Sequence, residues 1–595
     1  MRTRIHSVLV LLALALPASA QQWHQAESKT FLVTSTAGEA EARRTLVRAE
    51  QLKTVFGQIL RKTQVNTPRG MHLLVIRDPQ TLQQADIGLG ADTLAASARL
   101  YSGLERRAVL MKPDQWESAT ALIGSVLLET NYPKTPAWFD AGFATYFGAL
   151  QLARDSVQLG LAPGGLKPAA DWIPLTALLT MPAAPENPQW AHQSWLFVHW
   201  ILSNGRLDAA SKYFQAVMTQ GAEPRVALEI AFTISAADLD RELRDYASKA
   251  GSNSRKIPAP SVADAGSYPV RKITPEQAVA TLADVALDSP GEAARTRALS
   301  QLQAMMRQNP EEVRIHRALA YAYMRAGDAT NGLEHVRRAI NLGDTNPATY
   351  YWHAVAHNGG REDVIEIQSA DVRLAPMLNA ALKEGDFPPA SDLLGLALMS
   401  AGRDEQARRA FGRAASLRPR NEIYLLHLAE SQVATGDAES AKALFSILRH
   451  SDSPEIARRA EQSEKVASRA VSRQERFESA QSTYKDITDP RWRPKPAEKA
   501  SEPSGAEQEN SKKPDLRKTQ YVKGTLLAID CSTGPGATLS VHAAGKLWTF
   551  AVEDRKSVLL LGAEQFDCAW AKRPVSINYK ASGTREGDVV SLEVQ

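Results

Sequence analysis

Long apolar segments, cysteines and excess charge are all scarce in this chain of 595 residues, and each scarcity excludes a class of protein. The apolar run from Val8 to Leu16 is shorter than the roughly 20 residues of a membrane-spanning helix, and no later segment is long and apolar enough to span. No cluster of Cys and His has the spacing of a zinc site. The formal net charge of +4 gives no electrostatic case for binding nucleic acid or a membrane surface.

The composition that remains is that of an ordinary globular protein, too long for a single core. Hydrophobic residues make up 44% of the sequence and charged residues 23%. Because single hydrophobic cores stop growing beyond about 250–300 residues, several domains are expected.

The first 20 residues have the three parts of a secretory signal peptide. Arg2 and Arg4 form a basic start, an apolar run follows, and Ala18-Ser19-Ala20 is a typical cleavage site. The alternative is an uncleaved membrane anchor, for which the run is short. We therefore predict an exported protein, periplasmic or secreted, whose mature chain begins at residue 21 and has no membrane span.

The two cysteines, Cys531 and Cys568, both lie near the C-terminus. In an exported protein such a lone pair favours a disulfide, and the alternative is two separate buried thiols.

Residues 21–250 mix strands and helices. Alternating or continuously apolar stretches predict strands at 29–36, 71–78 and 106–113, and helical spacing dominates afterwards. Residues 251–272 are rich in Gly, Ser and Pro, which predicts a linker.

Residues 273–465 are helical and repetitive. Segments such as "ALMSAGRDEQARRAFGRAASLRP" and "SQVATGDAESAKALFSIL" share a Gly-containing turn between two amphipathic helices, and Gly402 and Gly436 are 34 positions apart. This period resembles tetratricopeptide repeats, which stack helix pairs into a solenoid. The resemblance implies a concave surface that binds a protein or peptide.

The C-terminal part divides into a tether and a β-domain. Residues 466–516 are charged, contain Pro and have few apolar groups, which predicts a disordered linker. Residues 517–595 carry five or six short alternating segments with Gly-containing turns, which predict a small β-barrel or sandwich. Trp548 and Phe550 share one parity there, and it is either core or an exposed platform.

The stretch "PAWFDAGFATYFG", with "FLVTST", "WIPLTALL" and "AHQSWLFVHWIL", resembles the zinc-peptidase-like domain of the gluzincin "peptidase MA" group. The resemblance covers roughly residues 27–250 and implies an α+β zinc-peptidase-like domain. The fold class we predict is thus multidomain: this α+β domain, then the helical solenoid, then the small all-β domain.

The resemblance also shows which residues are missing. The family's His-Glu-x-x-His motif falls on Ala121, Leu122 and Ser125, and the Glu of its Asn-Glu-Gly motif falls on Ala141. A further acidic position is Thr145, and no His lies between residues 73 and 191. Neither Ala nor Leu can bind zinc or take up a proton, so we predict no catalytic residue, no metal site and no cofactor.

Other candidate ligands are isolated. Glu129 and Asp140 lie near the degenerate motif, but two carboxylates do not make a gluzincin site. His192 and His199 share a helical face, as do His353 and His357, and a metal role competes in both cases with simple packing. We favour packing.

The sequence therefore favours an exported, non-catalytic protein-binding protein, a probable pseudo-metallopeptidase that binds a protein or peptide through its repeats and does not bind nucleic acid. The alternatives are a zinc-dependent peptidase with non-standard ligands and a self-associating structural protein of the envelope. Neither the partner nor the oligomeric state follows from the sequence.

Overall fold

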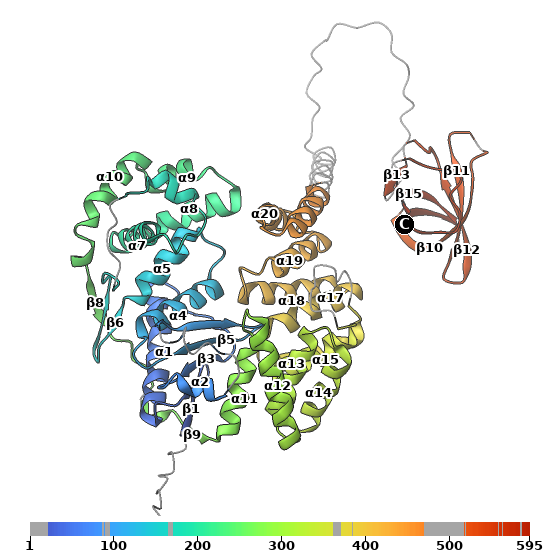
Figure 1. The fold of residues 1–595 in the computed structure, drawn as a ribbon. Helices are drawn as coiled ribbons and strands as arrows, with labels where there is room; N and C mark the ends of the chain where they lie inside the picture. The colour runs from blue at the N-terminus through green and yellow to red at the C-terminus, as the bar shows by residue number, and fades with distance from the viewer. Residues whose placement is uncertain are drawn as a thin grey trace, which may run out of the picture. The chain divides into compact units, whose positions relative to one another are not determined.

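The structure is a computed structural model, shown in Figure 1. It describes residues 22–468 and 517–594, apart from 86–88, 90–93, 95, 165–170, 264, 361–369, 384, 518, 533, 557, 562, 564, 584 and 585. The chain divides into two compact units, 1–492 and 493–595. The predicted signal peptide lies outside the described residues, as does the predicted linker 466–516 apart from 466–468, which are helical.

The first unit is built on a six-stranded sheet with the order β4-β5-β3-β2-β1-β9. Strands β2, β3 and β5 are parallel, and β1, β4 and β9 run antiparallel to their neighbours. The three strands predicted at 29–36, 71–78 and 106–113 are β2, β3 and β5, which confirms those predictions. The bounds are β1 Trp23–Glu27, β2 Phe31–Ser35, β3 Met71–Val75, β4 Arg99–Ser102, β5 Arg107–Met111 and β9 Val270–Ile273.

Residues 22–273, here called the N-terminal region, place helices on one face of this sheet and beyond it. Successive side chains of a strand point to opposite faces, and Phe31 and Val33 point to the face that packs on α1 and α4. Helix α5 packs on α4 and on α7. The helices are α1 Glu39–Ile59, α2 Gln80–Ala85, α4 Trp116–Asn131, α5 Ala137–Gly148, α6 Leu175–Thr180, α7 Pro188–Ser203, α8 Leu207–Gln220, α9 Pro224–Phe232 and α10 Ala236–Ala247.

The segment predicted as a linker, residues 251–272, differs from that expectation because it takes part in two sheets. Strand β8, Arg255–Pro258, pairs with β7, Ser156–Leu159, which itself pairs with the two-residue strand β6, Gln151–Leu152. Strand β9 pairs with β1. Edge positions tolerate the Pro-containing composition because a Pro there leaves no ladder hydrogen bond unmade on the open side.

Residues 275–468, here called the repeat region, are helical and confirm the helical-repeat prediction. Gly327, Gly402 and Gly436 adopt positive φ just after the first helix of a pair, where glycine has no steric cost. Asp328 and Asp437 then cap the second helix. The helices are α11 Pro275–Ala286, α12 Glu292–Gln308, α13 Val313–Arg325, α14 Ala329–Asn341, α15 Pro347–His357, α16 Ala375–Lys383, α17 Pro388–Ser400, α18 Asp404–Leu417, α19 Glu422–Ala434 and α20 Ala438–Leu448, with a further helical stretch at 454–468.

The repeat region shares a hydrophobic core with the sheet. The sheet face opposite α1 contributes Trp23, Leu74 and Leu110 to a cluster that continues through α11–α18. Figure 1 shows the sheet between α1 on one side and α11 on the other. The sheet therefore separates two cores, and the repeats are joined to the N-terminal region by a packed interface.

The second unit is a small β-barrel. Its strand order β12-β11-β10-β14-β15 is closed by a parallel pairing of β12 with β15, and the short β13 adds to β15. Phe550 is fully buried and stacks on half-buried Trp548, so this parity forms core and Leu547 is exposed. The bounds are β10 Thr519–Asp530, β11 Ala537–Ala543, β12 Lys546–Val552, β13 Leu559–Leu561, β14 Arg573–Gly583 and β15 Glu586–Val594.

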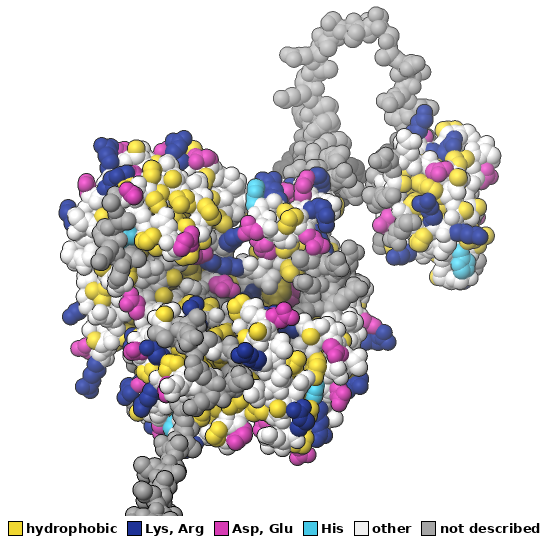
Figure 2. Space-filling view, viewed as in Figure 1, with side chains coloured by type: hydrophobic (Ala, Val, Ile, Leu, Met, Phe, Trp, Pro, Cys, Tyr) yellow, Lys and Arg dark blue, Asp and Glu magenta, His cyan; other side chains and the backbone are white. Residues whose placement is uncertain are grey.

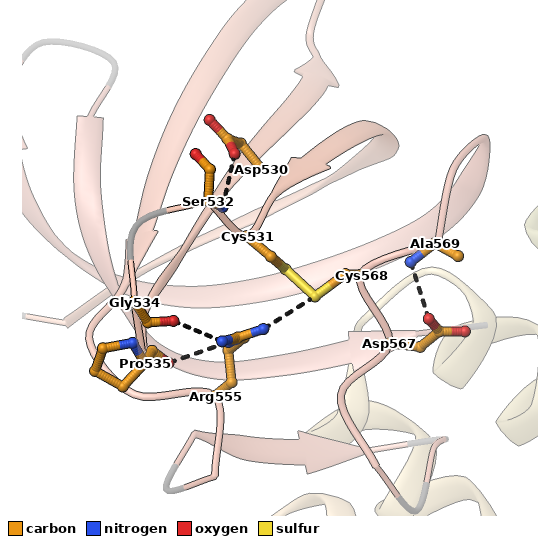
Figure 3. The surroundings of a disulfide bond; sticks show 9 residues. All are labelled: Asp530, Cys531, Ser532, Gly534, Pro535, Arg555, Asp567, Cys568 and Ala569. Atoms are coloured by element: carbon orange, nitrogen blue, oxygen red, sulfur yellow. Dashed lines mark hydrogen bonds between the residues drawn. A yellow bond between two sulfur atoms is a disulfide. The ribbon is translucent and has the colours of Figure 1, made fainter.

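The two cysteines form a disulfide in this barrel, with Cα atoms 6.1 Å apart (Figure 3). The bond links Cys531, just after β10, to Cys568 in the loop before β14. Arg555 lies beside it and donates to the carbonyl oxygens of Gly534 and Pro535 and to the Cys568 sulfur. The disulfide thus joins two loops that are far apart in sequence.

Candidate functional site

Helices α4 and α5 carry the positions where the resemblance places a zinc site, and the structure uses these positions for packing. Leu122 and Ala141 are half-buried and pack against the core of the N-terminal region. Ala121 lies at the crossing of the two helices, where a Cβ added at Gly148 would come within 2.9 Å of the Ala121 Cβ. The Ser125 hydroxyl donates to the Ala121 carbonyl oxygen.

This set of side chains does not fit a zinc ion. Zinc needs imidazole, thiolate or carboxylate ligands, and the four positions supply two methyl groups, one isobutyl group and one hydroxyl group. Among the described residues, no group of three or more His, Cys, Asp or Glu side chains is placed to hold a metal ion.

The two nearby carboxylates are each engaged by arginine. Glu129 accepts a hydrogen bond of 3.0 Å from Arg107 of β5. Asp140 accepts from the Thr135 hydroxyl at 2.5 Å and from both terminal nitrogens of Arg420, at 2.8 and 3.0 Å. Because Arg420 belongs to the loop between α18 and α19, Asp140 joins the N-terminal region to the repeat region.

The neighbouring glycine and histidines are structural. A Cβ at Gly142 would lie 2.2 Å from the Ser194 carbonyl oxygen, so α5 and α7 can approach this closely only with glycine there. His199 is buried and bonds Tyr246 and the Gly160 carbonyl oxygen, which confirms the packing interpretation. His192 is also buried, and burial lowers the pKa of both histidines.

The other histidine pair lies in the repeat region. His353 and His357 are on α15 with ring centroids 4.8 Å apart. Burial, followed by the charges of His357 and Arg337, lowers the pKa of His353. The described residues around them include no third ligand for a metal ion.

A second contact between the two regions centres on Asp288, at the end of α11. Its carboxylate has no exposed surface and accepts from Arg106 at 2.6 and 2.8 Å and from the Tyr321 hydroxyl at 2.5 Å. Arg106 also pairs with Asp284 at 2.5 Å. Burial alone would lower the pKa of Arg106, but the carboxylates of Asp284 and Asp288 raise it above its ordinary value.

Further contacts follow the same line along the repeats. Glu105 and Arg418 form a buried ion pair, and burial raises the pKa of Glu105 against the opposing effect of Arg418. At the far end, the Ser446 hydroxyl of α20 donates to the Thr219 carbonyl oxygen of α8 at 3.0 Å. The repeat region thus touches the N-terminal region from α11 to α20.

Sequence reasoning missed these contact residues. Arg106 and Asp288 are 182 positions apart, and Arg420 and Asp140 are 280 apart. The only signal in the chain is the pair of arginines that flank Pro419, and nothing in its spacing indicates a partner.

Over the described residues, no helix combines the length and apolar character needed to cross a bilayer. No protein-family model matches the chain. No curated protein matches it either.

Solved structures match only the helical part. TTC0263, a tetratricopeptide-repeat protein from Thermus thermophilus, is 19% identical, with a TM-score of 0.24, over 31% of this chain and 97% of its own. YrrB, called a TPR protein with an unusual peptide-binding site, is 17% identical, with a TM-score of 0.24, over 32% of this chain and 91% of its own. Pseudomonas aeruginosa pilF is 15% identical, with a TM-score of 0.26, over 33% of this chain and 87% of its own.

Proposed function

We propose that this chain is an exported, non-catalytic protein-binding protein. Its N-terminal region has a zinc-peptidase-like shape without the metal site, and its helical repeats present surfaces for a protein or peptide. The proposal combines the signal-peptide pattern of residues 1–20 with the helix pairs of the repeat region.

The observation that carries the proposal is the pairing of Asp140 with Arg420. Asp140 precedes the position of the third zinc ligand, and both of its oxygens accept hydrogen bonds from a residue of the repeats. A surface that would face substrate in a peptidase is here part of the contact with a second structural region. Bidentate pairs of this kind are among the stronger and more directional side-chain contacts.

The chemistry of the neighbouring side chains points the same way. Hydrolysis of a peptide bond by a gluzincin needs an activated water, and the residues at the corresponding positions can neither hold the metal nor accept the proton. Glu129 is within reach of the same surface, but its carboxylate is paired with Arg107.

The test combines metal content with exposure to peptides. The mature chain, purified from an export compartment without chelators, is analysed by mass spectrometry and then incubated with a broad library of peptides. We expect far less than about one zinc per chain, retention of a subset of the peptides and no cleavage. Cleavage that a chelator abolishes would establish a peptidase with non-standard ligands instead.

Sedimentation at several protein concentrations separates the remaining alternative. A binding protein of this kind keeps the same sedimentation coefficient over the range, and it retains peptides throughout. Growth of the coefficient with concentration, together with no peptide retained, would show a self-associating structural protein.

A further inference from the structure

A groove of about 860 Å³ follows helix α14 in the repeat region. Its lining comes from α14 itself, from Met306 of α12 and from the region of α13 and α15. Leu333 and Arg337 are four positions apart and therefore lie on one face of α14. The groove extends along most of a helix of 13 residues, or about 20 Å at 1.5 Å per residue.

The groove combines an apolar floor with a cationic rim. Met306 and Leu333 supply apolar surface, and Arg337 and Arg338 are the cations. Figure 2 shows Lys and Arg side chains and a histidine gathered over α14. Glu334 is the one acidic residue among those that line the groove.

The two arginines are available to a ligand. Arg338 approaches Glu311 only to 3.6 Å, with both side chains largely exposed, and such pairs contribute little. In the part of the chain that the structure describes, Arg337 makes no hydrogen bond or ion pair. An anion placed here would gain two charge-assisted contacts without displacing a strong internal one.

The base of the groove is fixed by two histidines. The Nδ1 atoms of His316 on α13 and His335 on α14 are 2.9 Å apart, and His316 Nε2 contacts the Pro310 carbonyl oxygen at 2.9 Å. His335 also stacks on Tyr323. These contacts hold α13 against α14, so the groove exists before a ligand binds, and a preformed site avoids part of the entropic cost of binding.

Other surfaces of the repeats are occupied by the chain itself. The sheet covers α11 and α13, and the loop between α18 and α19 contacts the N-terminal region. Helix α14 is the second helix of its pair, and the groove side of it faces no residue of the N-terminal region among its lining. An open, elongated groove of this type suits a peptide segment, whereas small molecules occupy enclosed cavities.

We propose that the α14 groove binds an acidic segment of a partner protein, with an apolar side chain on Met306 and Leu333 and carboxylates on Arg337 and Arg338. The inference rests on the proposed protein-binding function and adds the location of the site and the charge of the ligand. The occupant is a segment with alternating apolar and acidic side chains, because only that chemistry matches both the floor and the rim.

The test measures the binding of a short fluorescein-labelled peptide of alternating leucine and aspartate to the mature full-length chain, by fluorescence anisotropy. A peptide with asparagine in place of aspartate is the uncharged probe. We expect saturable binding of the acidic peptide and at least tenfold weaker binding of the uncharged one. Arg337→Glu and Arg338→Glu should each weaken binding of the acidic peptide at least fivefold.

The matched control is Arg409→Glu, which reverses an exposed arginine on α18 outside the groove. It should leave the affinity within twofold of the unmodified chain, and thermal unfolding should show that all three variants keep their folded state. Equal losses in the groove and control variants would mean non-specific attraction and overturn the proposal.

Two further outcomes separate the groove from the proposed function. If the acidic peptide binds and neither groove variant weakens it, the site lies elsewhere and the protein-binding function stands. If neither labelled peptide binds but members of the broad library are retained, the groove proposal alone is overturned. If no peptide of any kind is retained, both proposals fail.

Discussion

The two faces of the six-stranded sheet are buried to a similar degree but by different means. The face toward α1 is covered by apolar side chains that include Phe31, Val33 and Leu73. The face toward the repeats also carries a row of polar side chains, in which Arg271 donates to Gln25, Gln25 donates to Thr34, and Thr34 contacts His72 Nε2 at 2.8 Å. One face belongs to a single region, and the other is an interface between two regions.

The difference shows how the two regions are held in one arrangement. Apolar contacts are non-directional and tolerate sliding, so they secure burial more than register. Hydrogen bonds and ion pairs such as Arg106–Asp288 have defined geometry, and leaving one partner unpaired costs more than the bond contributes. The polar row and the ion pairs therefore select one position of the repeats on the sheet.

The largest effect is expected from the apolar face. Phe31→Ala removes a ring that is 1% exposed, and the cavity should cost about 4 kcal/mol of the free energy of unfolding. Chemical denaturation followed by tryptophan fluorescence measures the loss. Ile230→Ala, at a residue 73% exposed on α9, should change stability by less than about 0.5 kcal/mol. Equal effects of the two substitutions would contradict the assignment of Phe31 to the core.

A somewhat smaller loss is expected at the polar interface. Asp288→Ala leaves Arg106 and the Tyr321 hydroxyl without their buried acceptor, which should cost about 3 kcal/mol. Hydrogen exchange should rise first in α11–α13 and later in α1, because only the repeat side loses its anchor. Asp284→Ala, at a carboxylate 37% exposed, is the control and should cost less than half as much. Exchange that rises uniformly in both regions would refute the comparison of the two faces.

The polar row should also make the interface sensitive to acid. Burial, followed by the charge of Arg106, lowers the pKa of His72 to about 3. The unfolded chain takes up this proton near pH 6.5, so the stabilisation is complete above that pH and is lost as the pH falls toward 3. Between pH 6.5 and 4.5 the loss should reach about 2–3 kcal/mol.

His72→Gln provides the comparison for that titration, because glutamine can bond Thr34 but cannot take up a proton. Urea unfolding at a series of pH values should give a shallower slope for the variant between pH 6.5 and 4.5. Parallel slopes for the two proteins would show that other groups cause the acid sensitivity.

Local patterns in the sequence predicted the elements, and long-range contacts escaped it. Alternation in "FLVTST" and the apolar run in "MHLLVIRD" identify β2 and β3, and the 34-residue spacing of Gly402 and Gly436 identifies helix pairs. Strands β8 and β9 were missed because short pieces such as "RKIP" have no apolar periodicity and pair only at sheet edges. The choice between disulfide and thiols needed the barrel's closure, which brings the Cys531 and Cys568 loops together.

The candidate site divides in the same way. The absence of zinc ligands at Ala121, Leu122, Ser125 and Ala141 can be read directly from the sequence once the helix is aligned. The engagement of Asp140 by Arg420 cannot, because it depends on how the repeats lie against α5. A contact between residues hundreds of positions apart leaves no trace in local composition or spacing.

The smallest effect is expected where the interface is most open, at Arg420. Its side chain is 19% exposed and that of Asp140 is 33% exposed, so solvent screens the pair and Arg420→Ala should cost about 1–2 kcal/mol. Lys134→Ala, which breaks an exposed pair with Asp452, is the control and should cost less than about 0.5 kcal/mol. A double-mutant cycle of Arg420→Ala with Asp140→Ala isolates the pair, and a coupling energy of about 1 kcal/mol is expected. A coupling near zero would mean that the repeats are held by the shared apolar core alone, and the polar contacts would then have no part in positioning them.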